Sequence, residues 1–263
     1  MQVWCMNNWL KAKKAMPLVW MITGTVAFTL AWQMMARVYG PLLVATPAET
    51  LESAVRLFTS PPAVAAFSRT LGRVLLALGL QIMAGLAFGL LAGFYPWVED
   101  LFKPAVSILV AVPPVALALF VIFVFGGGER QVVAAAVALG FPLLYGGAVT
   151  AVRSVDRGLL EMLRVFRVPK ATQLLAAYVP ATLYSLLPSI LLAAGLTVRL
   201  LIMAEVIVGV DRGIGQALSQ ARVHMATAEI FAWMLVMAAT VLLIEGVMLY
   251  LVKSHVLAWQ ARR

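Results

Sequence analysis

Six long stretches with almost no charged residues are the feature that most constrains the fold of this chain. They contain between 22 and 28 residues. A helix needs about 20 apolar residues to cross a hydrocarbon core of about 30 Å, so each stretch is long enough to span a membrane. The stretches are Ala15–Ala36, Val74–Val98, Pro104–Gly128, Gln131–Val152, Ala171–Val198 and Ile230–Val252, the last interrupted only by Glu245.

The fifth stretch is too long for one span, because it continues past Arg199 and Glu205 to Val210. We therefore expect its first part to lie outside the bilayer. The composition agrees with a membrane protein, since only 12% of residues are charged, against about 25% in soluble domains. The sequence predicts an all-α polytopic membrane protein, with residues 1–263 forming one transmembrane domain. Its six expected spans cover about 15–36, 74–95, 104–126, 131–152, 183–210 and 230–252.

The distribution of basic residues predicts the orientation. Lys11, Lys13 and Lys14 precede the first span, which is longer than the roughly 7 to 15 apolar residues of a signal peptide and is read as a retained helix. With a cytoplasmic N-terminus, the inner segments hold 12 Lys and Arg residues and the outer segments 7, in agreement with the positive-inside rule. We expect a multi-pass protein of the bacterial inner membrane with both termini in the cytoplasm.

The first outer loop contains a helix signal. Thr46-Pro47-Ala48-Glu49 is a capping box with proline at the first helical position. Leu51, Ala54, Val55 and Phe58 follow at helical spacing, and Pro61-Pro62 ends the segment. An amphipathic helix over 47–58 is expected at the outer surface, either bound to a partner or resting in the membrane interface alone.

The inner loop between the fourth and fifth spans predicts a second amphipathic helix, over 156–167. Asp156 is a suitable N-cap, and the apolar residues that follow recur at i, i+3, i+4 and i+7. On the other face, Glu161 is spaced to pair with Arg157 and Arg164. Val168-Pro169 ends this helix, and a further helix from Pro169 is expected to end or kink near Pro180. Such a helix-turn-helix suits docking to another protein; a basic loop on anionic headgroups is the alternative.

Three charges lie within the expected spans: Arg199, Glu205 and Glu245. Charged groups near the bilayer centre cost at least about 2.5 to 3.5 kcal/mol each, so they normally face a bundle interior or a water-filled path. Arg199 and Glu205 are six residues apart, which places them too far along and around one helix for an easy ion pair. Each has either a structural partner elsewhere or a place in a solute path, where Arg199 would attract an anion.

Several kinds of chemistry are absent from the sequence. There is no GxxxxGK[ST] loop for nucleotide phosphates, no HExxH and no GxSxG. The single cysteine, Cys5, and two separated histidines, His224 and His255, predict no metal site. Basic residues are not interleaved with aromatics as in a nucleic-acid-binding surface. We therefore expect a non-enzymatic chain that binds no cofactor, with any ATP hydrolysed by a partner.

Glycine spacing predicts close helix packing in the second span. Gly85, Gly89 and Gly93 recur every four residues, which lets another helix approach the backbone. The pattern indicates a helical bundle but does not identify the partner helix.

Several segments together resemble one known family. In the inner loop, Glu161 and Pro180 have the spacing of the Glu-Ala-Ala…Gly…Ile-x-Leu-Pro motif of ABC importer permeases. Five motif positions differ, with Met162 and Leu163 at the alanines, Arg167 at the glycine, Ala177 at the isoleucine and Val179 at the leucine. Other segments resemble the nitrate, sulfonate and taurine branch of this family: Thr46–Glu49, Val112-Pro113-Pro114, Ser154-Val155-Asp156, Ala204-Glu205 and Gly213-Ile214-Gly215.

The resemblance implies a membrane-spanning permease of an ATP-driven importer for a small anionic solute such as a sulfonate, taurine or nitrate. It further implies a permease homodimer, two ATP-binding subunits that hold ATP and Mg²⁺, and an extracytoplasmic solute-binding protein. The coupling helix would contact the ATPase through Asp156, Glu161, Arg164, Arg167, Pro169 and Lys170. Arg199 and Glu205 are the candidates for the translocation path.

Two other classes of function stay open at this point. A secondary transporter or channel not driven by ATP would place polar groups and broken helices at the midplane of both halves. A membrane enzyme would need converging acid and base groups, which the sequence lacks. A vitamin precursor or another small organic solute is the alternative to an anion.

Overall fold

A computed structural model describes residues 2–252, with the side chains of 19–156 and 158–250. Every regular element within residues 2–252 is a helix, so the expected all-α fold is confirmed. The helices are α1 (Gln2–Tyr39), α2 (Pro47–Thr59), α3 (Pro61–Phe94), α4 (Pro96–Ala111), α5 (Pro114–Phe125), α6 (Glu129–Arg153), α7 (Arg157–Val165), α8 (Lys170–Gln173), the π-helix η1 (Leu174–Tyr178), α9 (Val179–Val208), α10 (Ile214–Val223) and α11 (Thr227–Val252).

Some residues used above lie outside the described side chains. They are Cys5, Lys11, Lys13, Lys14, Arg157 and His255, together with three of the basic residues counted in the inner segments, Lys253, Arg262 and Arg263.

The chain forms two compact units. One contains residues up to Thr59 together with Gln220–Leu235, and the other contains Ser60–Ser219 and the chain from Val236. Five helices are long and apolar enough to cross a membrane, or six if the bent pair α4 and α5 counts as one span. The polytopic membrane architecture predicted from the sequence is therefore present in the described residues.

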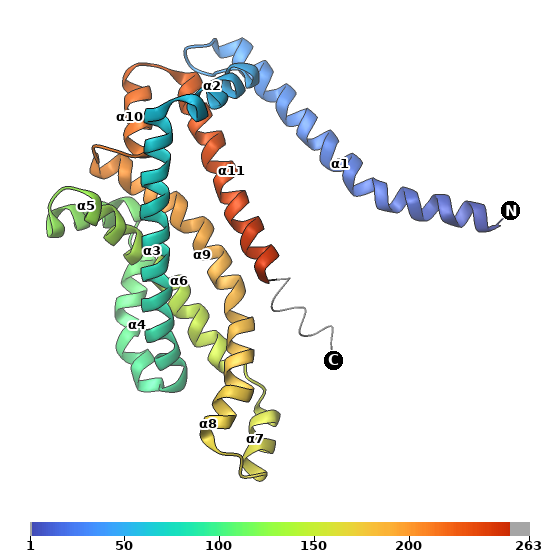
Figure 1. Ribbon diagram of the computed structural model, residues 1–263, viewed down its shortest axis with the longest axis vertical. Coiled ribbons are helices and arrows are strands. Elements are labelled where there is room, and N and C mark those ends of the chain that lie inside the picture. The colour runs from blue at the N-terminus through green and yellow to red at the C-terminus, as the bar shows by residue number, and fades with distance from the viewer. Residues whose placement is uncertain (1, 253–263) are drawn as a thin grey trace. The chain divides into compact units, whose positions relative to one another are not determined.

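The larger unit is organised around α3, α6 and α9, which run side by side (Figure 1). The glycines of α3 pack against α6, so α6 is the partner helix that their spacing alone does not identify. A Cβ atom on Gly85 would lie 2.5 Å from Leu144 Cβ, and one on Gly89 would lie 2.6 Å from the Tyr145 carbonyl oxygen. One on Gly93 would lie 2.6 Å from Val152 Cβ. Only glycine therefore permits this helix spacing.

The third expected span, over 104–126, differs from a single continuous helix. The chain forms α4 and α5, which are bent by 111° relative to each other. Val112 and Pro113 have extended ψ angles of 129° and 135°. Two consecutive prolines explain the break, because each lacks an N–H donor and disfavours the α conformation of the residue before it.

The boundaries of two other spans also differ from the expected ones. α3 begins at Pro61 rather than near Val74, so Arg69 and Arg73 belong to the helix and not to an outer loop. The helix that begins at Lys170 does not end at Pro180. Its π-helical turn, in which the Val179 N–H donates to the Leu174 carbonyl, widens the backbone just before that proline, and α9 continues from there to Val208.

In the smaller unit, α2 forms the predicted capping box. The Thr46 N–H donates to a Glu49 carboxylate oxygen at 2.9 Å, and the Glu49 N–H donates to Thr46 Oγ1 at 3.2 Å. The first of these bonds lowers the pKa of Glu49. The apolar residues Leu51, Val55 and Phe58 are exposed, so this face is available to the membrane interface or a partner.

Candidate functional site

The first candidate region is α7 and the turn that follows it, at one end of the larger unit (Figure 1). Asp156 caps the helix by accepting a hydrogen bond from the Gly158 N–H at 2.8 Å. The helix then runs from Arg157 to Val165. Val165 and Phe166 remain 79% and 73% exposed. α7 therefore presents large apolar side chains without a partner in the described residues.

The turn after α7 is held by backbone hydrogen bonds. The Arg167 N–H donates to the Arg164 carbonyl and the Val168 N–H to the Leu163 carbonyl, both at 3.0 Å. Arg167 adopts a left-handed φ of 50°, a conformation that glycine adopts at helix C-termini without strain. This is the position at which the resembled motif has glycine. Pro169 then caps α8, which begins at Lys170.

The predicted coupling residues therefore lie along one helix and its turn, from Asp156 to Lys170. All six have exposed side chains. The predicted pairing is not observed between Glu161 and Arg164, for which no ion pair is formed within the described side chains. Their charges are therefore available to a partner.

Arg167→Gly is expected to stabilise this turn by about 1 kcal/mol, because it removes the cost of a left-handed conformation at a residue with a Cβ atom. The measurement is amide hydrogen exchange of the peptide covering 163–170, which should become several-fold slower. Arg164→Gly, placed in the regular helix, should instead speed exchange. Faster exchange in Arg167→Gly would contradict the assignment of strain.

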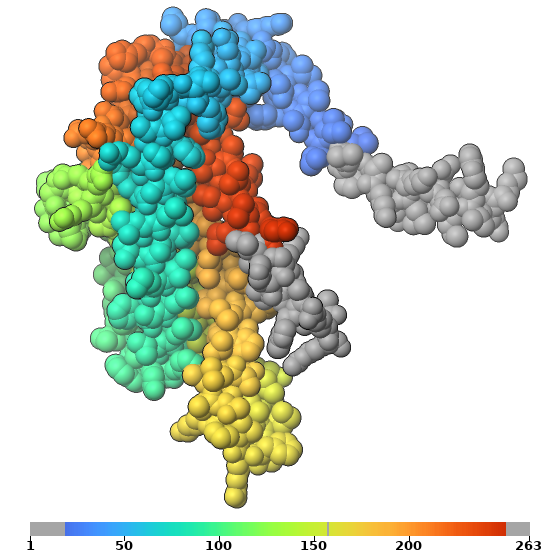
Figure 2. All heavy atoms as spheres, in the orientation of Figure 1, coloured from blue at the N-terminus to red at the C-terminus, as the bar shows by residue number. Residues whose placement is uncertain are grey.

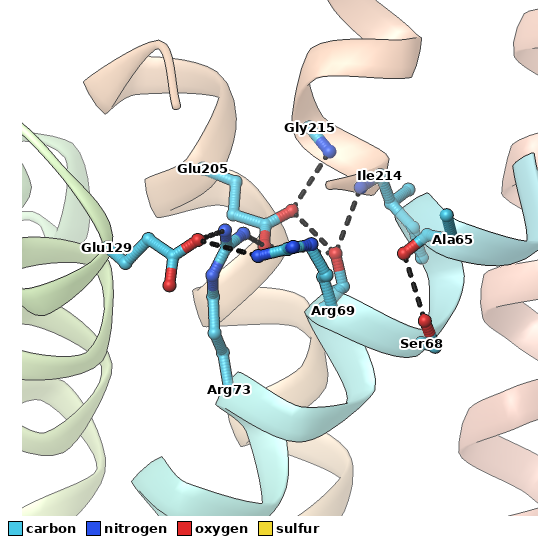
Figure 3. Close-up of polar contacts among 9 residues, drawn as sticks. Ala65, Ser68, Arg69, Arg73, Glu129, Glu205, Ile214 and Gly215 are labelled. Carbon is cyan, nitrogen blue, oxygen red and sulfur yellow. Dashed lines mark hydrogen bonds and ion pairs between the residues drawn. The ribbon is translucent and has the colours of Figure 1, made fainter. Parts of the chain in front are cut away.

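The second candidate region is a buried polar cluster where the end of α9 meets α3 and the start of α10 (Figure 3). The Glu205 side chain is fully buried and forms an ion pair with Arg73 of α3. Thr70 Oγ1 donates to Glu205 at 2.9 Å, and the Gly215 N–H donates to Glu205 at 3.0 Å. The Ile214 N–H in turn donates to Thr70 Oγ1 at 2.9 Å. The cluster thus joins α3 and α9 to the first turn of α10.

Two glycines make room for this cluster. Gly213 has a φ of 146°, and a Cβ atom there would lie 2.8 Å from Arg73 Nη1 and from both carboxylate oxygens of Glu205. A Cβ atom on Gly215 would collide with Glu205 Cβ. The Gly213-Ile214-Gly215 segment is therefore required for the close approach of the loop to Glu205.

Arg73 also connects the cluster to α6. Its Nη2 lies 2.7 Å from Glu129 Oε1, and Arg69 Nη1 lies 3.6 Å from the same oxygen. Arg73 and Thr70 were not predicted as site residues, because the charge at Arg73 ends the uncharged stretch and placed both residues in a loop. The sequence signal for these residues was Pro61, because proline is favoured at the first position of a helix and therefore indicates that the second helix begins there.

The structure does not bring Arg199 and Glu205 together. Glu205 is buried and bound, whereas Arg199 is exposed on α9 in the single chain rather than buried within the bundle. Glu245 of α11 lies against Gly195, where an added Cβ atom would collide with its carboxylate. Glu205 is thus held by buried hydrogen bonds and an ion pair, whereas the Arg199 side chain is exposed.

Sequence comparison identifies relatives that share most of this chain. The family described as "Binding-protein-dependent transport system inner membrane component" matches residues 85–256. A putative aliphatic sulfonates transport permease of Bacillus subtilis, SsuC, is 30% identical over 187 residues, covering 70% of this chain and 67% of the relative. The taurine transport system permease TauC of Escherichia coli is 25% identical over 230 residues, covering 84% and 83%.

Solved structures share the fold at low sequence identity. The inward-facing MetNI methionine ABC transporter matches with a TM-score of 0.60 and 18% identity, covering 74% of this chain and 98% of the matched one. A bacterial alginate ABC transporter in complex with a periplasmic protein matches with a TM-score of 0.64 and 12% identity, covering 94% and 98%. With the family match and the SsuC relationship, these findings show that the chain belongs to the binding-protein-dependent transport system inner membrane components, the permease subunits of ABC importers.

Proposed function

We propose that this permease forms the solute path of an ATP-driven importer, as a homodimer with two ATP-binding subunits and an extracytoplasmic solute-binding protein. ATP and Mg²⁺ belong to the ATP-binding subunits. ATP binding would close the ATPase pair, move α7 and expose the path outward, and hydrolysis would reset it. The permease would thus have two conformations, and the ATPase and the solute path would each shift the equilibrium between them, which is what couples the two sites. The family favours this function over a secondary transporter or channel.

The observation that carries the proposal is the exposed surface of α7. In the space-filling view, the chain around α7 and α8 (yellow) extends beyond the turn between α3 and α4 (Figure 2). Val165 and Phe166 are largely exposed there beside Arg164 and Arg167. Exposed apolar groups flanked by charge are typical of a protein docking surface.

The orientation follows from the same proposal. An ATPase works in the cytoplasm, so α7 lies on the cytoplasmic side of the inner membrane and the Glu205 cluster near the outer side. An even number of spans then places both termini in the cytoplasm, as the distribution of basic residues predicts.

Glu161→Ala and Arg164→Glu test the docking surface. Each variant is expected to insert normally but to reduce ATPase binding and ATP-driven uptake about tenfold, because the docking surface loses or reverses a charge. Asp100→Ala and Lys103→Glu are matched controls, since they are exposed at the same end of the unit but outside α7. Full ATPase binding and uptake in both α7 variants would contradict the assignment.

Arg199 supports a homodimer with a path between its copies. It lies nine residues before the end of α9, about 14 Å along the helix. A cation exposed to lipid at this depth costs about 2.5 to 3.5 kcal/mol, whereas one that faces water or a second copy costs less. We therefore place this face of α9 on the path.

Because SsuC and TauC are named as permeases for sulfonates and taurine, we propose a small solute with an acid group. Arg199→Ala is then expected to lower uptake of that solute about tenfold, because the cation no longer stabilises an anion on the path. The measurement is initial uptake into proteoliposomes. Arg222→Ala, also exposed but in α10, should transport normally; unchanged uptake in Arg199→Ala would remove Arg199 from the path.

A further inference from the structure

A polar pocket lies beside the Glu205 cluster, where the loop before α6 meets the loop after α9. Its volume is about 530 Å³, within the range of small-molecule sites. It is lined by Arg69, Gly127, Gly128, Glu129, Val208, Gly209, Val210, Asp211 and Arg212. The pocket is thus built entirely within the larger unit, at the end opposite α7.

The charges of this lining are balanced. Arg69 and Arg212 contribute two positive charges, and Glu129 and Asp211 contribute two negative charges. Glu129 is already engaged by Arg73 at 2.7 Å and by Arg69 at 3.6 Å. The exposed side chains of Asp211 and Arg212, in contrast, form no ion pair within the described side chains. The pocket therefore offers one anion and one cation to a ligand.

The start of α6 adds donors for an acid group. Gly128 is the N-cap residue, and its cap is not made by a side chain. Within the described side chains, none accepts a hydrogen bond from the first N–H groups of this 25-residue helix, and these groups lie at the positive end of the helix dipole. Together with Arg212, which also lines the pocket, they favour an anionic group within it.

We infer that this pocket binds a small zwitterion, with its acid group towards Arg212 and the start of α6 and its ammonium group towards Asp211. The inference rests on the proposed function and narrows its solute class. A solute with an acid group alone would be repelled by Asp211, and an ammonium group converts that repulsion into attraction. A neutral lining therefore selects an amino-sulfonate or amino acid over an alkanesulfonate.

Binding of two isosteric probes to the purified chain in lipid nanodiscs tests this inference. Taurine carries an ammonium group where 2-hydroxyethanesulfonate carries a hydroxyl group. The chain is expected to bind taurine about tenfold more tightly, because a hydrogen bond to a charged group stabilises more than one to a neutral group. Equal affinity for the two probes, or no saturable binding of taurine, would overturn the inference.

Two variants test whether this pocket causes the preference for taurine. Asp211→Asn should reduce the taurine preference to about twofold or less, and Arg212→Gln should weaken both probes about tenfold. Asp100→Asn and Lys103→Gln are the controls, being exposed residues of α4 outside the lining. A tenfold preference that survives in Asp211→Asn would overturn the assignment.

If ATP-driven uptake persists while the preference for taurine is absent, only the zwitterion inference fails. If ATP-driven uptake is absent, the proposed function fails.

Discussion

Arg73→Met is expected to lower the free energy of unfolding by about 3–5 kcal/mol, since it leaves the Glu205 carboxylate unpaired in a buried site. Glu205→Leu is expected to lower it by less, because Arg73 keeps its 2.7 Å ion pair with Glu129. Arg73 is 6% exposed and Glu205 is fully buried. Glu205 also accepts hydrogen bonds from Thr70 and the Gly215 N–H. Loss of its carboxylate therefore releases the start of α10 as well as Arg73. The measurement is thermal or denaturant unfolding of the purified chain in lipid nanodiscs.

The double variant Arg73→Met/Glu205→Leu separates the two contributions. It should be more stable than Arg73→Met alone, because the unpaired Glu205 carboxylate is then absent. Arg69→Met is the control, since Arg69 is half exposed and its ion pair with Glu129 is long at 3.6 Å; its loss should cost less than about 1 kcal/mol. If the two single variants cost no more than Arg69→Met, the cluster does not anchor these helices.

Gly89→Ala is the second variant expected to have a large effect, lowering the free energy of unfolding by about 1–3 kcal/mol. The added Cβ atom would lie 2.6 Å from the Tyr145 carbonyl oxygen and 2.6 Å from Ala148 Cβ. Because the carbonyl belongs to the backbone of α6, relief requires the two helices to separate.

Gly79→Ala is a matched control in the same helix. Nothing lies within 4 Å of a Cβ atom there, so only the higher helix propensity of alanine acts, which stabilises by about 0.5–1 kcal/mol. Both variants are compared by unfolding in the same nanodiscs. Opposite signs are expected, and a Gly89→Ala variant as stable as Gly79→Ala would contradict close packing of α3 on α6.

Much of the fold was predictable from sequence because spans depend on local properties. A stretch of about 20 apolar residues is sufficient to indicate a spanning helix, and the capping box of α2 and the Asp156 cap of α7 are formed by neighbouring residues. The bend between α4 and α5 was harder to predict from the sequence. Val112-Pro113-Pro114 shows that a helix is perturbed, but the 111° angle depends on tertiary packing.

The buried cluster could not be predicted, because its members are distant in sequence. Thr70 and Arg73 meet Glu205 across 135 and 132 residues. The uncharged stretch that predicts the second span begins directly after Arg73, so the charge that neutralises Glu205 lies outside the predicted span. Conversely, Arg199 and Glu205 looked equivalent as intramembrane charges, and only their positions around α9 distinguish an exposed residue from an anchored one.

The most direct test of the central claim, that α7 couples this permease to an ATPase, is affinity purification of the full chain from native membranes followed by ATPase assays in nanodiscs. An ATP-binding subunit is expected to co-purify, and its turnover is expected to rise when the solute-bound binding protein is added. Glu161→Ala and Arg164→Glu should lose both the subunit and the stimulation. Isolation of the chain alone, with uptake driven by an ion gradient and unaffected by ATP, would contradict the account.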